Sequence, residues 1–320
     1  MKRPASAGPA LKWRDPAACV VADAKPPLAF AACCAVWGTT FLAIKSSNDA
    51  LPPLWGAALR LGLAALLLGV AWAFTRDRMP RGRALGIVLV FGLLDFGVNL
   101  GLLYWGERSV PSGLAAVFYA TVPIATLLLA RAVGQETLDA WKLAGMVVAL
   151  AGVAVVFASE LGARADPWAL AAVLGAAVSA ALSSVVLRLA PPQPVLPTVA
   201  LGCGASALLL AGASLATRES LALPSSWSGW WPVVYLAIMG SIVAFGLFTW
   251  LLTRWPASSA TLVGVVVPVV AVAVGIVAGG ERLAPTTLLG GALVVAGVAG
   301  ALLRAKAVER TARDPSAPSR

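Results

Sequence analysis

The sequence has few charged residues and no histidine. Charged residues make up 12% and hydrophobic residues 60% of its 320 residues, and the mean hydropathy is +0.88. Soluble domains carry about 25% charged residues, so this composition excludes an ordinary soluble domain and predicts an integral membrane protein. The net charge of +10 does not indicate nucleic-acid binding, because the Lys and Arg residues lie in tails and short connections between apolar runs.

Signals for a metal site or a disulfide framework are also missing. The four cysteines, Cys19, Cys33, Cys34 and Cys203, have no metal-ligand spacing, and no histidine is present to complete a site. The sequence contains no nucleotide-binding motif and no connection long enough for an ATPase domain. We therefore expect no catalytic residues, no metal and no cofactor, and we predict that the chain is neither an enzyme nor a primary active transporter.

Ten apolar segments have the length of about 20 residues that a transmembrane helix needs. They cover residues 28–46, 53–75, 84–104, 111–133, 140–158, 167–189, 197–216, 230–252, 257–279 and 285–304. Their connections are short, so we expect consecutive helices to be antiparallel neighbours. Residues 1–27 and 305–320 are predicted to be polar tails.

The basic residues predict the orientation through the positive-inside rule. With a cytoplasmic N-terminus, 18 Lys and Arg residues fall on the cytoplasmic side and 4 on the other side. An even number of spans then places both termini in the cytoplasm. The excess of Ala, and of Arg over Lys, favours a bacterial cytoplasmic (inner) membrane.

An internal repeat relates the two halves of the chain. At an offset of 145 residues, segment 105–154 aligns with 250–299 without a gap, and 14 positions are identical. The informative pairs are Trp105 with Trp250, Pro111 with Pro256, Pro123 with Pro268, Gly134 with Gly279 and Glu136 with Glu281. Five helices per half is an odd number, so the halves must enter the membrane in opposite directions. The predicted fold is therefore all-α, with ten transmembrane helices in two inverted five-helix repeats, residues 28–158 and 167–304.

An inverted repeat allows two related bundles to exchange between outward-open and inward-open states around a site near the midplane. This architecture predicts secondary transport of a small solute by alternating access. The alternative is a gene duplication that was retained for packing alone.

Two charged side chains lie deep inside predicted spans. Arg60 lies about eight residues into its segment and Asp95 about a dozen, and a charge at the bilayer centre costs about 2.5–3.5 kcal/mol, so neither should face lipid. In one interpretation both face a cavity, where Arg60 binds a substrate carboxylate and Asp95 takes up protons. In the other interpretation, they pair with each other or with the backbone and hold the helices of the bundle together. Asn99 follows Asp95 by four residues and shares its helix face.

Aromatic residues and prolines supply further pathway candidates. Trp37 and Tyr119 lie deep in their spans. Pro123 and Pro268 occupy equivalent mid-span positions, where a proline removes a backbone hydrogen bond, kinks the helix and exposes a carbonyl. Matched helix breaks in two halves indicate a transport site; a purely structural kink is the alternative.

Acidic and small residues near the ends and along the faces of other spans have expected structural roles. Glu136 and Glu281 fall at the starts of connections, where we expect each to cap the next helix. Small residues at regular spacing allow helix backbones to approach closely. These positions are Gly175, Ser179 and Ser183 in the sixth segment and Gly290, Gly297 and Gly300 in the tenth.

Several short motifs together resemble the EamA family of the drug/metabolite transporter superfamily. The first segment contains AVWGTTF at 35–41, the second opens with LPP at 51–53, and residues 104–116 read YWGERSVPSGLAA. The turn GQETL at 134–138 recurs as GGERL at 279–283. The resemblance covers residues 28–304. It implies a central cavity between the first four helices of each half, a fifth helix that packs outside and often forms a homodimer, and export of amino acids, metabolites or drugs. Arg60 aligns with Ala205 in the second half, so no symmetric role is implied for it.

Two other classes of membrane protein stay open as alternatives. A membrane-embedded enzyme needs clustered catalytic groups, which this sequence lacks. A channel or signalling protein is the other alternative, although no filter-like loop is evident. The expected partners are the lipid bilayer and a small-molecule substrate. One basic side chain, one acidic side chain and several aromatics suit a zwitterion with an apolar body, such as an amino acid.

Overall fold

The computed structural model describes residues 25–110, 112–158, 166–279 and 285–313, and these ranges contain helices and no strand. The α-helices are α1 (Lys25–Ala50), α2 (Pro53–Ala73), α3 (Arg83–Gly92), α4 (Asn99–Gly106), α5 (Ser112–Tyr119), α6 (Val122–Ala132), α7 (Ala140–Val156), α8 (Pro167–Leu187), α9 (Val195–Ala216), α10 (Trp227–Tyr235), α11 (Phe245–Leu252), α12 (Ala257–Ala260), α13 (Val263–Gly279) and α14 (Pro285–Arg313). Two π-helical segments, η2 (Leu93–Val98) and η3 (Leu236–Ala244), join α3 to α4 and α10 to α11. The all-α prediction is confirmed for the described part of the chain.

Eight helical segments are long and apolar enough to cross a membrane. They coincide with eight of the predicted spans. In lipid, a long uncharged segment satisfies its backbone N–H and C=O groups by forming a helix. The predicted spans 140–158 and 257–279 contain shorter apolar helices, Ala140–Val156 and Ala257–Ala273.

The two π-helical segments occupy equivalent places in the two halves. At the 145-residue offset, residues 93–98 align with 238–243, which lie inside η3. A π-helical turn widens the helix and leaves part of its hydrogen-bond ladder out of register, and such turns are frequent at functional sites. The sequence predicts both spans as continuous α-helices, so the π-helical turns differ from that expectation.

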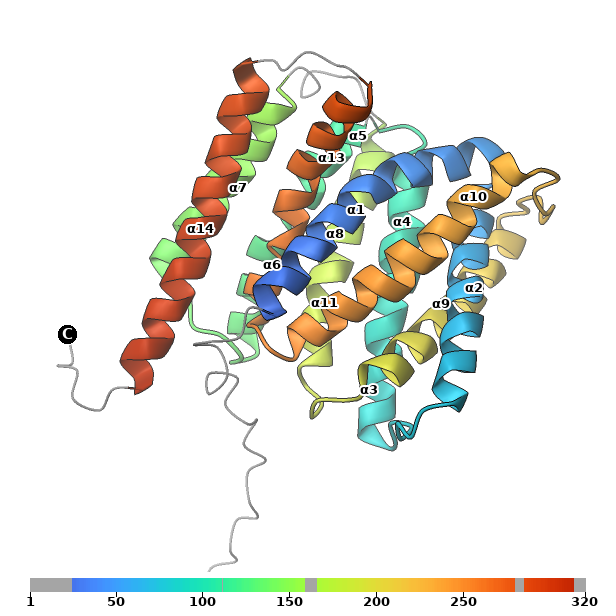
Figure 1. The fold of residues 1–320 in the computed structure, drawn as a ribbon, viewed down its shortest axis with the longest axis horizontal. Coiled ribbons are helices and arrows are strands. Elements are labelled where there is room, and N and C mark those ends of the chain that lie inside the picture. Colours follow the sequence, from blue (N-terminus) through green and yellow to red (C-terminus); the bar gives the residue numbers. More distant parts are fainter. Residues whose placement is uncertain (1–24, 111, 159–165, 280–284, 314–320) are drawn as a thin grey trace, which may run out of the picture.

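Helices α7 and α14 pack lengthwise against each other at one edge of the molecule (Figure 1). Their backbones meet at glycines: a Cβ atom added at Gly145 would lie 2.7 Å from the carbonyl oxygen of Gly297, and one added at Gly152 would lie 2.7 Å from that of Gly290. The predicted close packing of Gly290 and Gly297 is confirmed. Gly300 does not take part, because a Cβ there would meet nothing within 4 Å.

The outer surface of the bundle is apolar. Leu66 on α2, Leu208 on α9 and Val295 on α14 have exposed fractions of 64%, 78% and 66%. In water such a surface would drive aggregation, whereas in a bilayer it contacts lipid chains. The buried clusters lie inside, around Phe91 and Phe96 in one and around Leu127 and Met146 in another.

We predict that Gly297→Val destabilises the protein by about 1–3 kcal/mol, because side chains forced into a close-packed contact displace the backbone. A Cβ at Gly297 would lie 2.5 Å from the amide nitrogen of Ala149. Thermal unfolding in detergent measures the effect. Gly300→Val on the same helix is the matched control, and equal losses in the two variants would contradict the proposed contact.

Candidate functional site

A cavity with about 720 Å³ of empty space, part of it open to the outside, lies between the two halves. Five of the seven predicted pathway residues line it: Trp37, Arg60, Asp95, Asn99 and Tyr119. The other lining residues are Thr40, Ile44, Leu100, Leu103, Val122, Ala180, Ser184, Phe245, Phe248, Thr261, Val263, Gly264 and Val267. Most of this lining is apolar, which is usual for a small-molecule site with a few placed polar groups.

Arg60 on α2 is a buried cation, with 1% of its surface exposed. Its Nε donates to Ser241 Oγ at 2.9 Å, and its Nη1 donates to the Tyr104 hydroxyl at 3.4 Å. Gly240 makes room for the guanidinium, because a Cβ there would lie 2.7 Å from Nη2. Within the described residues no carboxylate forms an ion pair with Arg60. The guanidinium is therefore held by neutral groups beside the cavity.

Asp95 lies in η2 and is 3% exposed. Ser183 Oγ on α8 lies 3.0 Å from Asp95 Oδ1, while Oδ2 is buried without a hydrogen-bond partner among the described residues. The small-residue face of α8 makes this approach possible, and Ser179 Oγ also donates to the carbonyl of Leu94 in η2 at 2.8 Å. The predicted close packing of this face is confirmed.

Asn99 and Tyr119 are linked to each other. Tyr119 on α5 donates its hydroxyl to Asn99 Oδ1 at 3.1 Å, and Asn99 Nδ2 donates to the backbone carbonyl of Asp95 at 3.0 Å. The Tyr119 hydroxyl hydrogen and one of the two Asn99 amide hydrogens are therefore used within the protein. The amide orientation follows from this network.

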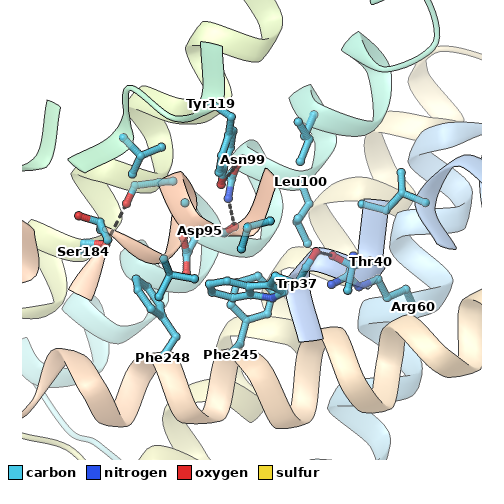
Figure 2. Close-up of a pocket in the computed structure, with 18 residues that line it drawn as sticks. Trp37, Thr40, Arg60, Asp95, Asn99, Leu100, Tyr119, Ser184, Phe245 and Phe248 are labelled. Atoms are coloured by element: carbon cyan, nitrogen blue, oxygen red, sulfur yellow. Dashed lines mark hydrogen bonds between the residues drawn. The ribbon is translucent and has the colours of Figure 1, made fainter. Parts of the chain in front are cut away.

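An aromatic wall separates the two charged groups. The ring of Trp37 on α1 lies 5.1 Å from that of Phe245 and 5.3 Å from that of Phe248, both on α11. In Figure 2, Trp37 lies between Asp95 and Arg60. The alternative in which Arg60 and Asp95 pair with each other is therefore wrong. Trp37 is one of the predicted pathway residues, whereas Phe248 is not, because the face that α11 turns inward depends on η3.

The two prolines do not line the cavity, and only Pro268 lies in mid-helix. Pro268 lies inside α13. Pro123 instead lies in the first turn of α6, because the chain leaves the helix at residues 120–121, between α5 and α6. The predicted helix break near Pro123 is present, but Pro123 itself lies in the first turn of α6 and not in mid-helix. A proline is tolerated in the first helical turn, where its missing N–H has no partner to lose.

Comparison with known proteins identifies the family. The model of the EamA-like transporter family matches residues 25–158 and 165–303. The chain belongs to this family. It is 33% identical over 250 residues to the uncharacterised inner membrane transporter YedA of Escherichia coli (strain K12), covering 78% of this chain and 81% of that protein. The likeness predicted from the motifs is confirmed.

Two relatives of this EamA-like chain have names that specify a solute. It is 28% identical to a probable terminal-alkyne amino-acid exporter of Streptantibioticus cattleyicolor, covering 89% of this chain and 94% of that protein. It is 29% identical to a probable amino-acid metabolite efflux pump of Salmonella typhimurium, covering 82% and 90%. A crystal structure with 24% sequence identity superposes with a TM-score of 0.72 over 89% of this chain and 98% of that chain, which shows the shared fold.

Glu107, at the C-terminal end of α4, is a half-buried ionisable group that the sequence does not single out. It belongs to the family-like motif at 104–116, but its Oε1 atom is buried and has no hydrogen-bond partner among the described residues. Burial raises the pKa of Glu107 to about 8. Sequence alone could not identify it, because Glu107 adjoins Arg108 at a predicted helix end, where exposure is the usual outcome.

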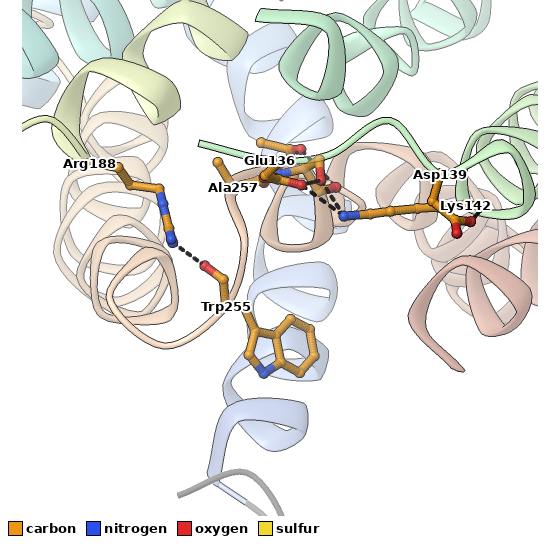
Figure 3. Close-up of polar contacts among 8 residues, drawn as sticks. Glu136, Asp139, Lys142, Arg188, Trp255 and Ala257 are labelled. Carbon is orange, nitrogen blue, oxygen red and sulfur yellow. Dashed lines mark hydrogen bonds and ion pairs between the residues drawn. The ribbon is translucent and has the colours of Figure 1, made fainter. Parts of the chain in front are cut away.

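Glu136 forms a buried polar cluster that joins the two halves (Figure 3). Its Oε2 lies 2.9 Å from Lys142 Nζ and also accepts from Ser258 Oγ, and its Oε1 accepts from the Ser258 amide at 3.0 Å. Glu136 therefore caps α12 of the second half and not the next helix, α7, whose first turn is capped by Asp139. The prediction that Glu136 caps the next helix is therefore wrong, because it caps α12 instead. Glu281, for which the same role is predicted, lies outside the described residues.

A second polar contact lies near this cluster. Arg188 Nη1, at the end of α8, donates to the carbonyls of Leu252 at 3.0 Å and Trp255 at 2.5 Å (Figure 3). Leu252 is the last residue of α11, whose final carbonyls have no helical donor, and Trp255 lies in the connection that follows. Arg188 therefore ties the end of one span to the connection that leads into α12.

We predict that Lys142→Met destabilises the protein by about 3–5 kcal/mol, because it leaves the buried Glu136 carboxylate without its cation. The side chains of Lys142 and Glu136 are only 7% and 8% exposed. Chemical unfolding in mixed micelles measures the loss. Adding Glu136→Gln should recover part of it, and Lys45→Met, on an exposed lysine, is the control. A loss no larger than that of the control would contradict a structural role for the pair.

Proposed function

We propose that this chain is a secondary transporter that exports small zwitterionic metabolites, such as amino acids or drugs, by alternating access and without ATP. It would cross the cytoplasmic membrane ten times, in two inverted repeats at 28–158 and 167–304, with both termini in the cytoplasm. The excess of basic residues on the expected cytoplasmic side supports this orientation.

The reciprocal contact between α7 and α14 supports the inverted repeat. At the 145-residue offset Gly145 is equivalent to Gly290 and Gly152 to Gly297, and the observed contacts are Gly145 with Gly297 and Gly152 with Gly290. A two-fold relation between the halves produces this exchange of partners. The equivalent placement of η2 and η3 agrees with it.

The observation that carries the proposal is the buried guanidinium of Arg60 beside an otherwise apolar cavity. A buried cation without an acidic partner costs free energy unless a ligand supplies the charge. The side chain is already fixed by Tyr104 and Ser241, so a carboxylate would meet an oriented donor. A carboxylate-bearing solute would place its apolar body against Trp37 and Phe245.

The relatives support the direction and the solute class. Two of them are named as an amino-acid exporter and an amino-acid metabolite efflux pump, and another is named as an inner membrane transporter. A homodimer through the fifth helix of each half stays a prediction.

Proton coupling at Asp95 is the finer part of this proposal. Asp95 borders the cavity, its Oδ2 has no partner among the described residues, and Ser183 offers only one hydroxyl. That hydroxyl also lies 2.8 Å from the carbonyl of Ala180, which can only accept. One proton cannot satisfy both acceptors, so a protonated Asp95 that donates from Oδ1 to Ser183 would leave the Ser183 hydrogen for the Ala180 carbonyl.

We expect Arg60→Met to reduce uptake of a carboxylate-bearing amino acid at least about tenfold, because hydrogen bonds to charged groups contribute about 1.5–3 kcal/mol each. The assay is saturable counterflow of a labelled amino-acid panel in proteoliposomes. Arg83→Met, at the exposed start of α3, is the control. Ohmic conductance in place of saturable exchange would favour a channel, and chemical conversion of the solute would favour an enzyme.

We expect Asp95→Asn to abolish accumulation driven by a proton gradient while facilitated exchange continues, because a carboxamide does not gain and lose a proton in the working pH range. Counterflow and gradient-driven uptake are measured on the same vesicles across pH. If the variant keeps the wild-type pH dependence, Asp95 does not carry the coupling proton.

A further inference from the structure

The segment that joins α2 to α3, residues 74–83, carries a cluster of exposed positive charge, and we call it the basic connection. It contains Arg76, Arg78 and Arg81, and Arg83 is the first residue of α3; all four side chains are exposed. Asp77 is the one acidic residue among them. Within the described part of the chain, no carboxylate lies at ion-pair distance from any of the four arginines. The protein itself therefore leaves this charge without a counter-charge.

The basic connection folds back on the end of α2. Trp72 Nε1, in the last turn of α2, donates to the carbonyl of Asp77 at 2.9 Å, and Thr75 Oγ1 donates to the carbonyl of Trp72 at 3.0 Å. Tryptophan is enriched where the hydrocarbon core meets the lipid headgroups. The bond to Trp72 thus keeps the middle of the connection beside the end of a membrane-spanning helix. Arg76 and Arg78 flank Asp77 in sequence, so they lie at the level of the headgroups.

Two large apolar side chains are exposed in the same connection. Phe74, which follows the last residue of α2, is 87% exposed, and Met79 is 45% exposed. In water, exposed apolar surface of this kind is unfavourable. At the membrane boundary the same side chains contact the ends of the acyl chains, while neighbouring arginines extend to the phosphates. The positive-inside rule accounts for the arginines, but it does not account for Phe74 and Met79 among them.

The basic connection also joins the helices that lead to the two charged residues of the cavity. Helix α2 carries Arg60, and α3 continues into η2, which carries Asp95. Figure 1 shows the connection at the end of the bundle where α3 begins. A ligand bound there contacts the ends of both helices without entering the cavity.

We propose that the basic connection is a docking surface for anionic phospholipids, with its arginines on the headgroup phosphates and with Phe74 and Met79 beside the acyl chains. Guanidinium groups bind phosphate oxygens through paired N–H donors. A zwitterionic lipid also has a phosphate, but its choline group offsets the charge, so the surface selects lipids with a net negative headgroup. This inference goes beyond the transport proposal, because it concerns neither the solute nor the direction of its movement.

The test uses the full-length protein in detergent micelles, titrated with phosphatidylglycerol or phosphatidylcholine that have identical acyl chains. A lipid that binds the folded state raises the midpoint of thermal unfolding, and native mass spectrometry counts the lipids retained. The variant is Arg76→Gln/Arg78→Gln, which removes two of the 18 basic residues expected on the cytoplasmic side and so preserves the charge bias. Lys45→Gln/Arg108→Gln is the matched control, with the same loss of charge at exposed positions outside the connection.

We expect the wild type to bind phosphatidylglycerol at least about tenfold more tightly than phosphatidylcholine, and Arg76→Gln/Arg78→Gln to weaken phosphatidylglycerol binding at least about tenfold. The control should stay within about twofold of the wild type. Arg76→Lys/Arg78→Lys keeps both charges and should stay within about threefold. Higher salt should weaken the binding of phosphatidylglycerol and leave that of phosphatidylcholine unchanged, because salt screens exposed charges.

Several outcomes would overturn the docking surface. They are equal affinity of the wild type for the two lipids, equal losses in the glutamine variant and its control, and a loss in the lysine variant as large as that in the glutamine variant. Inorganic phosphate tests the other source of the same chemistry. If phosphate alone stabilised the protein as much as phosphatidylglycerol does, the site would be one for free anions and the lipid proposal would be wrong. Because no solute is present in these measurements, their result is independent of whether the protein transports amino acids.

Discussion

The absence of water in the hydrocarbon core governs the rest of this structure. Every backbone N–H and C=O in that region has to find a partner within the protein, so irregular backbone is restricted to places that face the interior or a cavity. The irregular points follow this restriction. Asp95 lies in η2, Ser241 lies in η3, and Val122 and Val263, the first residues of α6 and α13, line the cavity. Polar chemistry and irregular backbone occur together because each needs shelter from lipid.

The two halves share a plan but differ where the solute would lie. Asp95 in η2 is equivalent to Gly240 in η3, and Gly240 is the residue whose missing side chain accommodates Arg60. Tyr119 is likewise equivalent to Gly264. In both pairs one half supplies a polar side chain and the other supplies space. The repeat thus preserves the backbone, while divergence at these positions gives the cavity its two chemically different sides.

Much of the fold could be predicted from the sequence because hydropathy acts locally. Long uncharged runs became helices at the expected places, and Arg60 and Asp95 faced inward because lipid excludes charge. The partner of Glu136 was not predictable, since Ser258 belongs to the other half and only the folded bundle brings them together.

The contact between Glu136 and Ser258 also bears on how the molecule assembles. The two residues are 122 positions apart in the chain, so during synthesis the carboxylate is made long before its second partner. Lys142, six positions away, is available almost at once. The first half would therefore enter the membrane with this carboxylate paired but only partly bonded, and α12 would complete the cluster when the second half arrives. A polar contact of this kind gives the late-arriving half a defined docking point on the early one, in a solvent where apolar surfaces alone offer little preference for one arrangement.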